Sequence, residues 1–311
     1  MHESKQLKSK FHVIAAISNS VMYRSRYRLF HEFAQHVRDS GVIHFHVAEL
    51  AQGSRKFHCT SPNNIYHTQL RSEDELWHKE NLIDIAAKKV FQNFPDAEYI
   101  AWIDADIRFA NPFWVDATIE ELQTSHVAQL FSHAIDLGPR GESLHIHNGF
   151  LYSYWNQLAR KPHYHNWHPG YAWAMTRYAY DRVGLITRAI LGSGDRHMAM
   201  SFIGCGERSY NAGVTPAYKK MVLNYQKKCE RYILRDVSYV PGTILHAWHG
   251  RKRDRQYQDR WQILVTNKYD PTSDVIEDSS GVLRLDDDRW ELRDAIKRYF
   301  RSRNEDSIDL E

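Results

Sequence analysis

The chain alternates between short apolar runs and amphipathic segments. Phe11 to Ser18 (FHVIAAIS) is apolar and rich in β-branched residues, which predicts a strand. The next segment repeats large apolar side chains at helical spacing, at Tyr23, Tyr27, Phe30, Ala34 and Val37. Gly41 marks the end of this helix, and Ile43 to Leu50 returns to a strand pattern.

A second helix and a further strand follow in the same order. Ser72-Glu73-Asp74-Glu75 has the pattern of a capping box, which predicts a helix running to about Phe91. Tyr99 to Ile103 is again apolar, β-branched and aromatic. Alternating strands and helices with short connections predict an α/β fold: a mostly parallel central sheet with helices on both faces. Ligands of such sheets bind beyond the carboxyl ends of the strands, where Ser18 and Asn19 are expected.

The pattern changes in the second half. From Ile135 to Pro169 it loosens into a stretch rich in glycine, histidine and aromatic residues, including HYHNWHPG, which predicts a long loop. Leu292 to Phe300 has helical periodicity, and the acidic end from Asn304 to Glu311 is expected to fray. We therefore expect a flexible N-terminus over residues 1–10, one domain over 11–265, and a C-terminal helical extension over 266–311 packed on that domain.

Two carboxylates, Asp104 and Asp106, come directly after the apolar run that ends at Ile103. Carboxylates at the end of a buried strand are costly unless their charge is compensated, and a divalent metal is the usual compensator. Oxygen ligands suit Mg²⁺ or Mn²⁺, which take further ligands from substrate phosphates. The pattern favours an enzyme that holds a diphosphate through a metal. The alternative is a solvated turn whose aspartates cap the next segment.

The order of the motifs resembles that of metal-dependent glycosyltransferases of the GT-A fold, which move a sugar from a nucleotide-diphosphate donor to an acceptor. The resemblance covers residues from about Phe11 to Arg260. It rests on D-A-D with the turn Asn111-Pro112-Phe113-Trp114 behind it, on GYAWAMTRYAYDRVG (Gly170 to Gly184), on LGSGD (Leu191 to Asp195) and on ILHAWHGRK (Ile244 to Lys252). One departure is the single Asp195 after Gly194, where family members often carry Glu-Asp or Gly-Glu.

The resemblance implies a metal site. Asp104 and Asp106 would bind Mn²⁺ or Mg²⁺ together with a histidine near the end of the matching region. A strand from Thr243 to Trp248 would turn His246 and His249 to opposite faces, so only one of them could join Asp106. The resemblance favours His246, the histidine that ends the apolar run.

The resemblance also implies a course for the reaction. Asp195 would be the general base that deprotonates the acceptor hydroxyl, which gives direct displacement with inversion; retention stays open. The glycines beside it would let a sugar approach the backbone closely. The alternative is that Asp195 caps the helix that begins near Arg196.

Two sets of residues are expected around the substrates. Nucleotide-sugar binding is expected from Ser18, Asn19, Lys79, Asp104, Gly194 and Arg251. Acceptor binding is expected from Trp167, His168 and Trp173, although core packing is the competing interpretation for Trp173. The basic run of Arg251, Lys252, Arg253 and Arg255 could close over the diphosphate as a lid. A solvated surface is the alternative for this run and for Lys79.

Composition limits the other classes of protein. The chain has 311 residues, of which 42% are hydrophobic and 25% charged, which is ordinary for a globular protein with a sizeable core. A formal charge of +3 is too small to indicate nucleic-acid binding by itself. The basic run nevertheless keeps a nucleic-acid-binding protein, or a DNA-modifying glycosyltransferase, as an alternative. A nucleotidyltransferase of related fold is another, but the glycine-rich loop expected of it is missing from SNSVMYRSR after the first strand.

The sequence leaves the substrates open, and it indicates the location of the protein only indirectly. The resemblance implies that the transferred group is a hexose or a pentose, and it leaves the acceptor open among a glycan, a small molecule and a nucleic acid. Three widely spaced cysteines predict free thiols in a reducing compartment. No signal-peptide pattern is visible, and no apolar run approaches the ~20 residues that a membrane span requires. We therefore expect a cytoplasmic protein without a membrane span.

Overall fold

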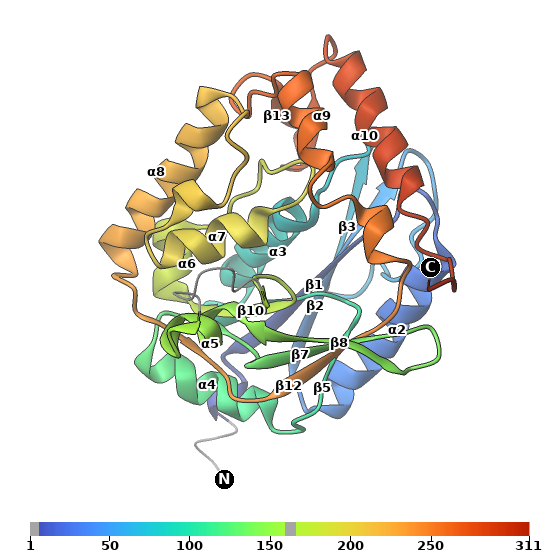
Figure 1. The fold of residues 1–311 in the computed structure, drawn as a ribbon. Coiled ribbons are helices and arrows are strands. Elements are labelled where there is room, and N and C mark those ends of the chain that lie inside the picture. Colours follow the sequence, from blue (N-terminus) through green and yellow to red (C-terminus); the bar gives the residue numbers. More distant parts are fainter. Residues whose placement is uncertain (1–5, 159–165, 311) are drawn as a thin grey trace.

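A seven-stranded sheet runs through the computed structural model, which describes residues 6–158 and 166–310 (Figure 1). Its strand order is β11-β6-β10-β4-β1-β2-β3. The four N-terminal strands are parallel: β1 (Phe11–Ser18), β2 (His44–Gln52), β3 (His67–Ser72) and β4 (Tyr99–Ile103). The remaining three are β10 (Ala172–Thr176), antiparallel to both of its neighbours, then β6 (Val127–Gln129) and β11 (Val237–Tyr239). The predicted α/β fold with a mostly parallel central sheet is confirmed.

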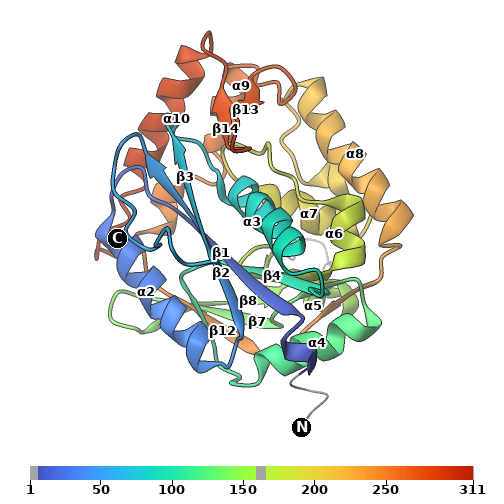
Figure 2. The same cartoon turned by 180° about the vertical axis from the view of Figure 1, so that it is seen from behind.

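Helices cover both faces of this sheet, because alternate strand residues send apolar side chains to opposite sides (Figure 2). One face packs against α3 (Lys79–Asn93), α6 (Arg177–Val183), α7 (Gly194–Phe202) and α8 (Pro216–Tyr232). The other packs against α2 (Arg24–Asp39) and α4 (Trp114–Thr124). The predicted end of α2 is confirmed, since Gly41 follows it with a φ of +74°.

A second, five-stranded sheet replaces most of the loop expected from Ile135 to Pro169. Its order is β5 (Ile107–Phe109), β12 (Thr243–His246), β7 (His133–Leu137), β8 (Ser143–Gly149) and β9 (Trp167–His168). The hairpin β7–β8 and the helix α5 (Phe150–Trp155) were not apparent from the sequence pattern. Residues 159–165 of the expected loop, including the start of HYHNWHPG, lie outside the described residues. The D-A-D motif connects β4 of the first sheet to β5 of the second.

The C-terminal part of the chain forms a third cluster of buried side chains. This part of the chain comprises η3 (Lys252–Arg255), α9 (Arg260–Thr266), the strand pair β13 (Val275–Glu277) and β14 (Leu283–Leu285), and α10 (Trp290–Ser302). Leu285, Leu292 and Ile296 are buried there with Tyr218 and Val222 of α8, which follows the short η2 (Gly206–Arg208). No helix among the described residues combines the length and apolar character needed to cross a bilayer.

The expected capping box at Ser72 is wrong. Ser72 ends β3, and α3 begins seven residues later at Lys79. The Ser72 hydroxyl instead accepts a hydrogen bond from the Asp74 N–H at 3.0 Å. The Asp74 carboxylate accepts from Leu285 N at 2.8 Å and from Arg293 Nε at 2.6 Å. The motif therefore connects the end of β3 to the C-terminal strand pair and α10.

The acidic C-terminal stretch, which was expected to fray, is held to the domain at Glu305 and Asp306. Glu305 is only 1% exposed and forms ion pairs with Arg26 and Arg303. Asp306 accepts hydrogen bonds from the N–H groups of Arg24 and Ser25, at 2.9 and 2.8 Å, and so caps the start of α2. At the other terminus, Lys8 pairs with an aspartate of α4, while residues 1–5 lie outside the described part.

A buried histidine pair links β1 to β2 away from the carboxyl ends of these strands. His12 Nδ1 and His46 Nε2 are 2.9 Å apart, and the His12 ring stacks on that of His44 at 4.3 Å. Burial, followed by the neighbouring imidazoles, lowers the pKa of both His12 and His46 to about 3. Both rings are therefore neutral in the folded protein at neutral pH.

We expect the free energy of unfolding to fall as the pH is lowered from about 6.5 toward 3. In this window the unfolded chain protonates its histidines and the folded chain does not, so protons favour unfolding. The expected loss at pH 5 is on the order of 2 kcal/mol for each imidazole. Urea unfolding of the wild type and of His46→Gln at pH 7 and pH 5 measures it. The variant should lose less stability, and an equal loss in both proteins would contradict the assignment.

Candidate functional site

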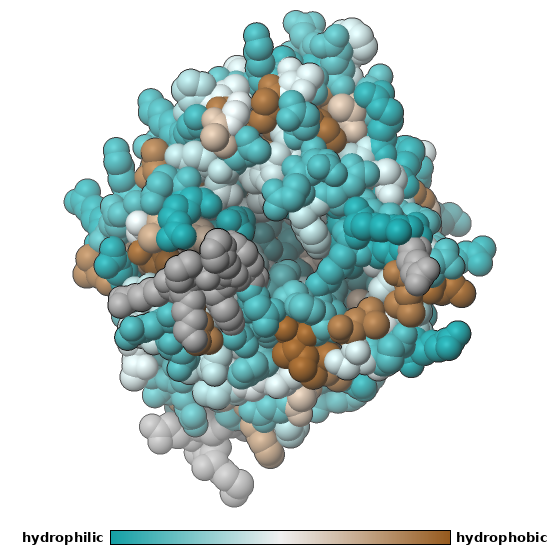
Figure 3. Space-filling model, viewed as in Figure 1, coloured by the Kyte–Doolittle hydropathy of each residue, from teal (hydrophilic) through white to brown (hydrophobic). Residues whose placement is uncertain are grey.

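A cavity of about 570 Å³ lies at the carboxyl ends of β1 and β4, and the surface of this face is hollowed at its centre (Figure 3). Its lining combines the residues after β1, the D-A-D motif, the start of α3, the start of α7, and the segment from His246 to Trp261. The expected location of a ligand beyond the strand ends thus coincides with a real cavity.

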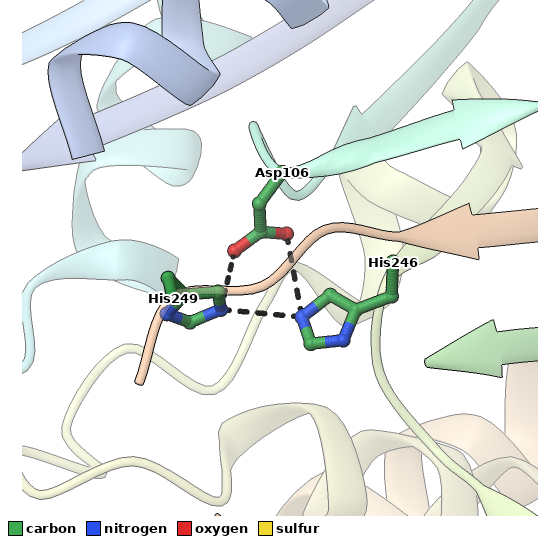
Figure 4. Close-up of side chains that lie close together, drawn as sticks. All are labelled: Asp106, His246 and His249. Atoms are coloured by element: carbon green, nitrogen blue, oxygen red, sulfur yellow. Dashed lines mark hydrogen bonds and ion pairs between the residues drawn. The ribbon is translucent and has the colours of Figure 1, made fainter. Parts of the chain in front are cut away.

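Asp106, His246 and His249 converge at one side of this cavity (Figure 4). His249 Nε2 lies 3.0 Å from Asp106 Oδ2, and His246 Nε2 lies 3.9 Å from Asp106 Oδ1. The two Nε2 atoms are 3.2 Å apart. Within residues 6–158 and 166–310 this is the only group of three metal-ligating side chains whose ligand atoms all lie within 4.8 Å of one another.

The chemistry of these three side chains fits a divalent cation. Asp106 Oδ1 is buried and has no hydrogen-bond partner among the described residues, so it is available as a ligand. Burial would raise the pKa of Asp106, but His249 and His246 outweigh it and hold that pKa well below its usual range. One carboxylate with two imidazoles suits Mn²⁺ or another transition metal better than Mg²⁺, which prefers oxygen ligands.

The expectation that only one of the two histidines could join Asp106 is wrong. It assumed a strand continuing to Trp248, but β12 ends at His246. The Ala247 N–H continues the pairing with β5 by donating to the Asp106 backbone oxygen at 2.8 Å, and the chain then turns. This turn brings His249 back to the same side as His246, so both imidazoles contact Asp106.

The two carboxylates of the D-A-D motif have different partners. Asp104 forms an ion pair with Lys79 at 2.5 Å and is not part of the histidine cluster. Burial raises the pKa of Asp104 to about 6, even though Lys79 acts in the opposite direction. Burial would lower the pKa of Lys79, but Asp104 and Asp195 outweigh it and raise that pKa. Lys79 is therefore a cation inside the cavity and not part of a solvated helix face.

Asp195 lines the cavity from the first turn of α7. Its Oδ1 accepts a hydrogen bond from the Arg196 N–H at 2.7 Å, and a Cβ atom at Gly170 would overlap its other oxygen. A Cβ atom at Gly194 would lie 2.7 Å from the carboxyl carbon of Glu80. Gly194 thus accommodates Glu80, whose pKa is raised to about 7 by burial.

Two buried arginines of the cavity, Arg255 and Arg260, have no carboxylate partner within 4.0 Å among the described residues. Arg255 donates to His249 Nε2 at 2.9 Å and to Tyr257 Oη at 3.1 Å, so a metal would compete with it for the imidazole. Arg260 donates to Ser193 Oγ at 2.9 Å. Buried guanidinium groups without an acidic partner favour an anionic ligand. The sequence pattern singled out the run containing Arg255 but gave no signal for Arg260.

Of the other residues expected to bind the donor, Ser18 and Asn19 lie at the cavity and Arg251 does not. Ser18 and Asn19 line the cavity, but the Asn19 side chain exchanges two hydrogen bonds with the Tyr23 backbone, at 2.8 and 2.9 Å, at the entrance to α2. Arg251 pairs with Asp254 at 2.9 Å and is not part of the lining. Lys252, the next residue, is part of it.

Of the three residues expected to bind the acceptor, only His168 lines the cavity, where it stacks on Tyr171 with ring centres 3.8 Å apart. Trp167 packs edge-on against Phe150. Trp173 is 2% exposed, sits in β10, and donates its indole N–H to the backbone oxygen of the proline at position 169. Trp173 is therefore a core residue, which was the alternative to acceptor binding.

No protein-family model matches this chain, and no curated protein matches it. Among solved structures, it is similar to glucosyl-3-phosphoglycerate synthase from Mycobacterium tuberculosis, solved with Mg²⁺ and UDP (12% identity over 86% of this chain and 81% of that one, TM-score 0.40). It is also similar to a Desulfovibrio desulfuricans protein described as a nucleotide-diphospho-sugar transferase (11% identity over 93% of this chain and 98% of that one, TM-score 0.33). A third similar structure is mannose-1-phosphate geranyltransferase from Thermus thermophilus (11% identity over 76% of this chain and 74% of that one, TM-score 0.34). None of these likenesses assigns an activity to the chain.

Proposed function

We propose that this protein is a metal-dependent glycosyltransferase of the GT-A fold, which moves a sugar from a nucleotide-diphosphate donor to an acceptor hydroxyl. The observation that carries the proposal is that the Asp106–His246–His249 cluster shares one cavity with Lys79, Arg255 and Arg260. Several cations around a candidate metal site favour a ligand with several negative charges. A nucleoside diphosphate is such a ligand, and small-molecule sites usually have volumes of about 300–1,000 Å³.

The residues of the cavity divide into roles. Asp106, His246 and His249 would hold the ion, for which Mn²⁺ is the favoured identity because two of the ligands are imidazoles. When bound, the ion supplies stabilisation of the negative charge on the leaving diphosphate. Lys79 and Arg255 would contact phosphate oxygens, with Asp104 fixing the position of the Lys79 ammonium group.

Asp195 is the proposed general base. It would take the proton of the acceptor hydroxyl while the acceptor oxygen forms its bond to the anomeric carbon and the bond from that carbon to the diphosphate breaks. A single displacement of this kind inverts the anomeric configuration. Support comes from the position of Asp195 on the cavity wall, at the start of α7.

A screen of nucleotide sugars tests the function without knowledge of the acceptor, because many transferases slowly pass their donor to water. Each donor is incubated with Mn²⁺, with Mg²⁺ or with a chelator, and the released nucleoside diphosphate and free sugar are measured. We expect release from at least one donor, only with metal. Pyrophosphate release from a nucleoside triphosphate and a sugar 1-phosphate would show a nucleotidyltransferase instead. Salt-dependent DNA binding without any turnover would favour a nucleic-acid-binding protein.

A further inference from the structure

A buried carboxylate lies behind one of the candidate metal ligands. Asp136 is 4% exposed, does not line the cavity, and has its Oδ1 atom 2.8 Å from His246 Nδ1. The strand register explains the contact, because β7 and β12 are parallel and pair Asp136 directly with His246. Neighbouring residues at one register position present their side chains on the same face of a sheet.

We propose that Asp136 is a positioning residue, which holds His246 in the tautomer that directs a free Nε2 lone pair at the metal site. The inference rests on the proposed metal dependence. An ionised carboxylate only accepts hydrogen bonds, so its neighbour Nδ1 must carry the proton of the neutral imidazole. The lone pair then lies on Nε2, the atom that faces Asp106 and His249. Metal-bound histidines are commonly fixed by a carboxylate in this way.

Four polar side chains surround the Asp136 carboxylate and orient it. Tyr171 Oη donates to Oδ1 at 3.0 Å, beside the bond from His246. His147 Nε2 contacts Oδ2 at 2.7 Å, and the Lys252 ammonium group contacts the same oxygen. The Lys252 ammonium group is the counter-charge of this carboxylate.

The Lys252 contact connects this carboxylate to the basic run that follows the metal histidines. Lys252 and Arg255 both belong to η3, and Arg255 donates to His249 Nε2 at 2.9 Å. One short segment therefore contacts both candidate histidine ligands, His249 directly and His246 through Asp136. This arrangement gives η3 a structural role at the site in addition to its positive charge.

The test is the affinity for Mn²⁺, measured in the absence of substrate from the electron paramagnetic resonance signal of the free ion. In Asp136→Asn, the amide can donate to Nδ1, which moves the imidazole proton to Nε2 and blocks that ligand atom. We expect Mn²⁺ affinity to fall by about 10- to 100-fold. Wild-type affinity in a folded Asp136→Asn protein would overturn the proposal.

Asp84 provides a matched control. It is a buried aspartate of α3 that also accepts from a tyrosine, Tyr180 Oη at 2.8 Å, and pairs with a lysine, Lys88 at 2.8 Å. Asp84→Asn removes the same charge in a similar environment away from the cavity. We expect unchanged Mn²⁺ affinity in this variant, and a loss equal to that of Asp136→Asn would show a general effect of folding and overturn the proposal.

A second measurement needs no Asp136 variant. Long-range ¹H–¹⁵N spectra of the metal-free wild type report the tautomer of His246, whose signals are identified by their absence in His246→Gln. The proposal requires the proton on Nδ1, and a proton on Nε2 would overturn it. This result is independent of the proposed function, which fails separately if the wild type binds no Mn²⁺.

Discussion

Asp106→Asn is expected to lose metal-dependent donor binding and to lower turnover by on the order of 10³-fold, the scale of an electrostatic contribution to the transition state. Asp106 is the single carboxylate of the candidate cluster, and its buried Oδ1 has no hydrogen-bond partner among the described residues. An asparagine keeps the shape of the side chain but removes the charge that two imidazoles alone cannot replace. Titration of the variant with Mn²⁺ and steady-state kinetics measure the two effects.

Asp104→Asn is the matched control for this prediction, since it changes the same residue type two positions away. Asp104 pairs with Lys79 and lies outside the cluster. We expect Mn²⁺ affinity close to that of the wild type and a raised KM for the donor, because Lys79 loses the carboxylate that positions it. Loss of Mn²⁺ affinity in Asp104→Asn with retention in Asp106→Asn would reverse the assignment of the two carboxylates.

Asp195→Asn is expected to lower kcat by about 10²- to 10⁴-fold, the usual contribution of a general base. The donor KM should barely change, because the carboxylate is assigned to the acceptor proton and not to the diphosphate. Steady-state kinetics with an identified donor and acceptor, together with a thermal unfolding curve, separate chemistry from folding.

Glu80→Gln is the comparison for Asp195→Asn, because Glu80 is another carboxyl group of the same cavity and lies next to Gly194. If Glu80→Gln lowers kcat and Asp195→Asn does not, the base is Glu80, whose pKa of about 7 would suit that task. If Asp195→Asn mainly lowers the melting temperature, Asp195 is the helix cap that the sequence offered as its alternative.

Local patterns predicted three of the seven strands of the central sheet, β1, β2 and β4. The apolar β-branched runs at Phe11–Ser18 and Tyr99–Ile103 are β1 and β4, with Asn19 and the D-A-D motif at their carboxyl ends. A parallel sheet buries its strands on both faces, so such strands are continuous apolar runs that a sequence displays directly. The position of the cavity follows from a second rule, that ligands of such sheets bind beyond the carboxyl ends of the strands.

The sequence could not predict contacts between residues far apart along the chain. Glu305 is buried because Arg26 lies beside it, 279 positions earlier, and nothing local in an acidic tail reveals such a partner. Asp136 meets His246 through strand register across 110 positions. Composition predicts solvation for such charges, whereas tertiary pairing decides their burial.

The prediction that His246 and His249 would point to opposite faces failed for a different reason. It assumed a strand that continues to Trp248, but the strand ends earlier. Alternation of side chains holds only while the strand continues, and element boundaries depend on hydrogen bonds that the sequence does not show. Here β12 ends at His246, and the bond from the Ala247 N–H to the Asp106 backbone oxygen continues the pairing with β5 by only one residue. Because His249 lies beyond the end of the strand, the alternation does not apply to it.

The central claim is that a divalent metal and a nucleoside diphosphate bind together in this cavity. Calorimetric titration of the wild type with a panel of nucleoside diphosphates, in Mn²⁺ and again in a chelator, tests it most directly. The account predicts that at least one nucleoside diphosphate binds more than about tenfold more tightly with Mn²⁺, a difference of about 1.4 kcal/mol. Equal affinity with and without the metal for every member of the panel would contradict it.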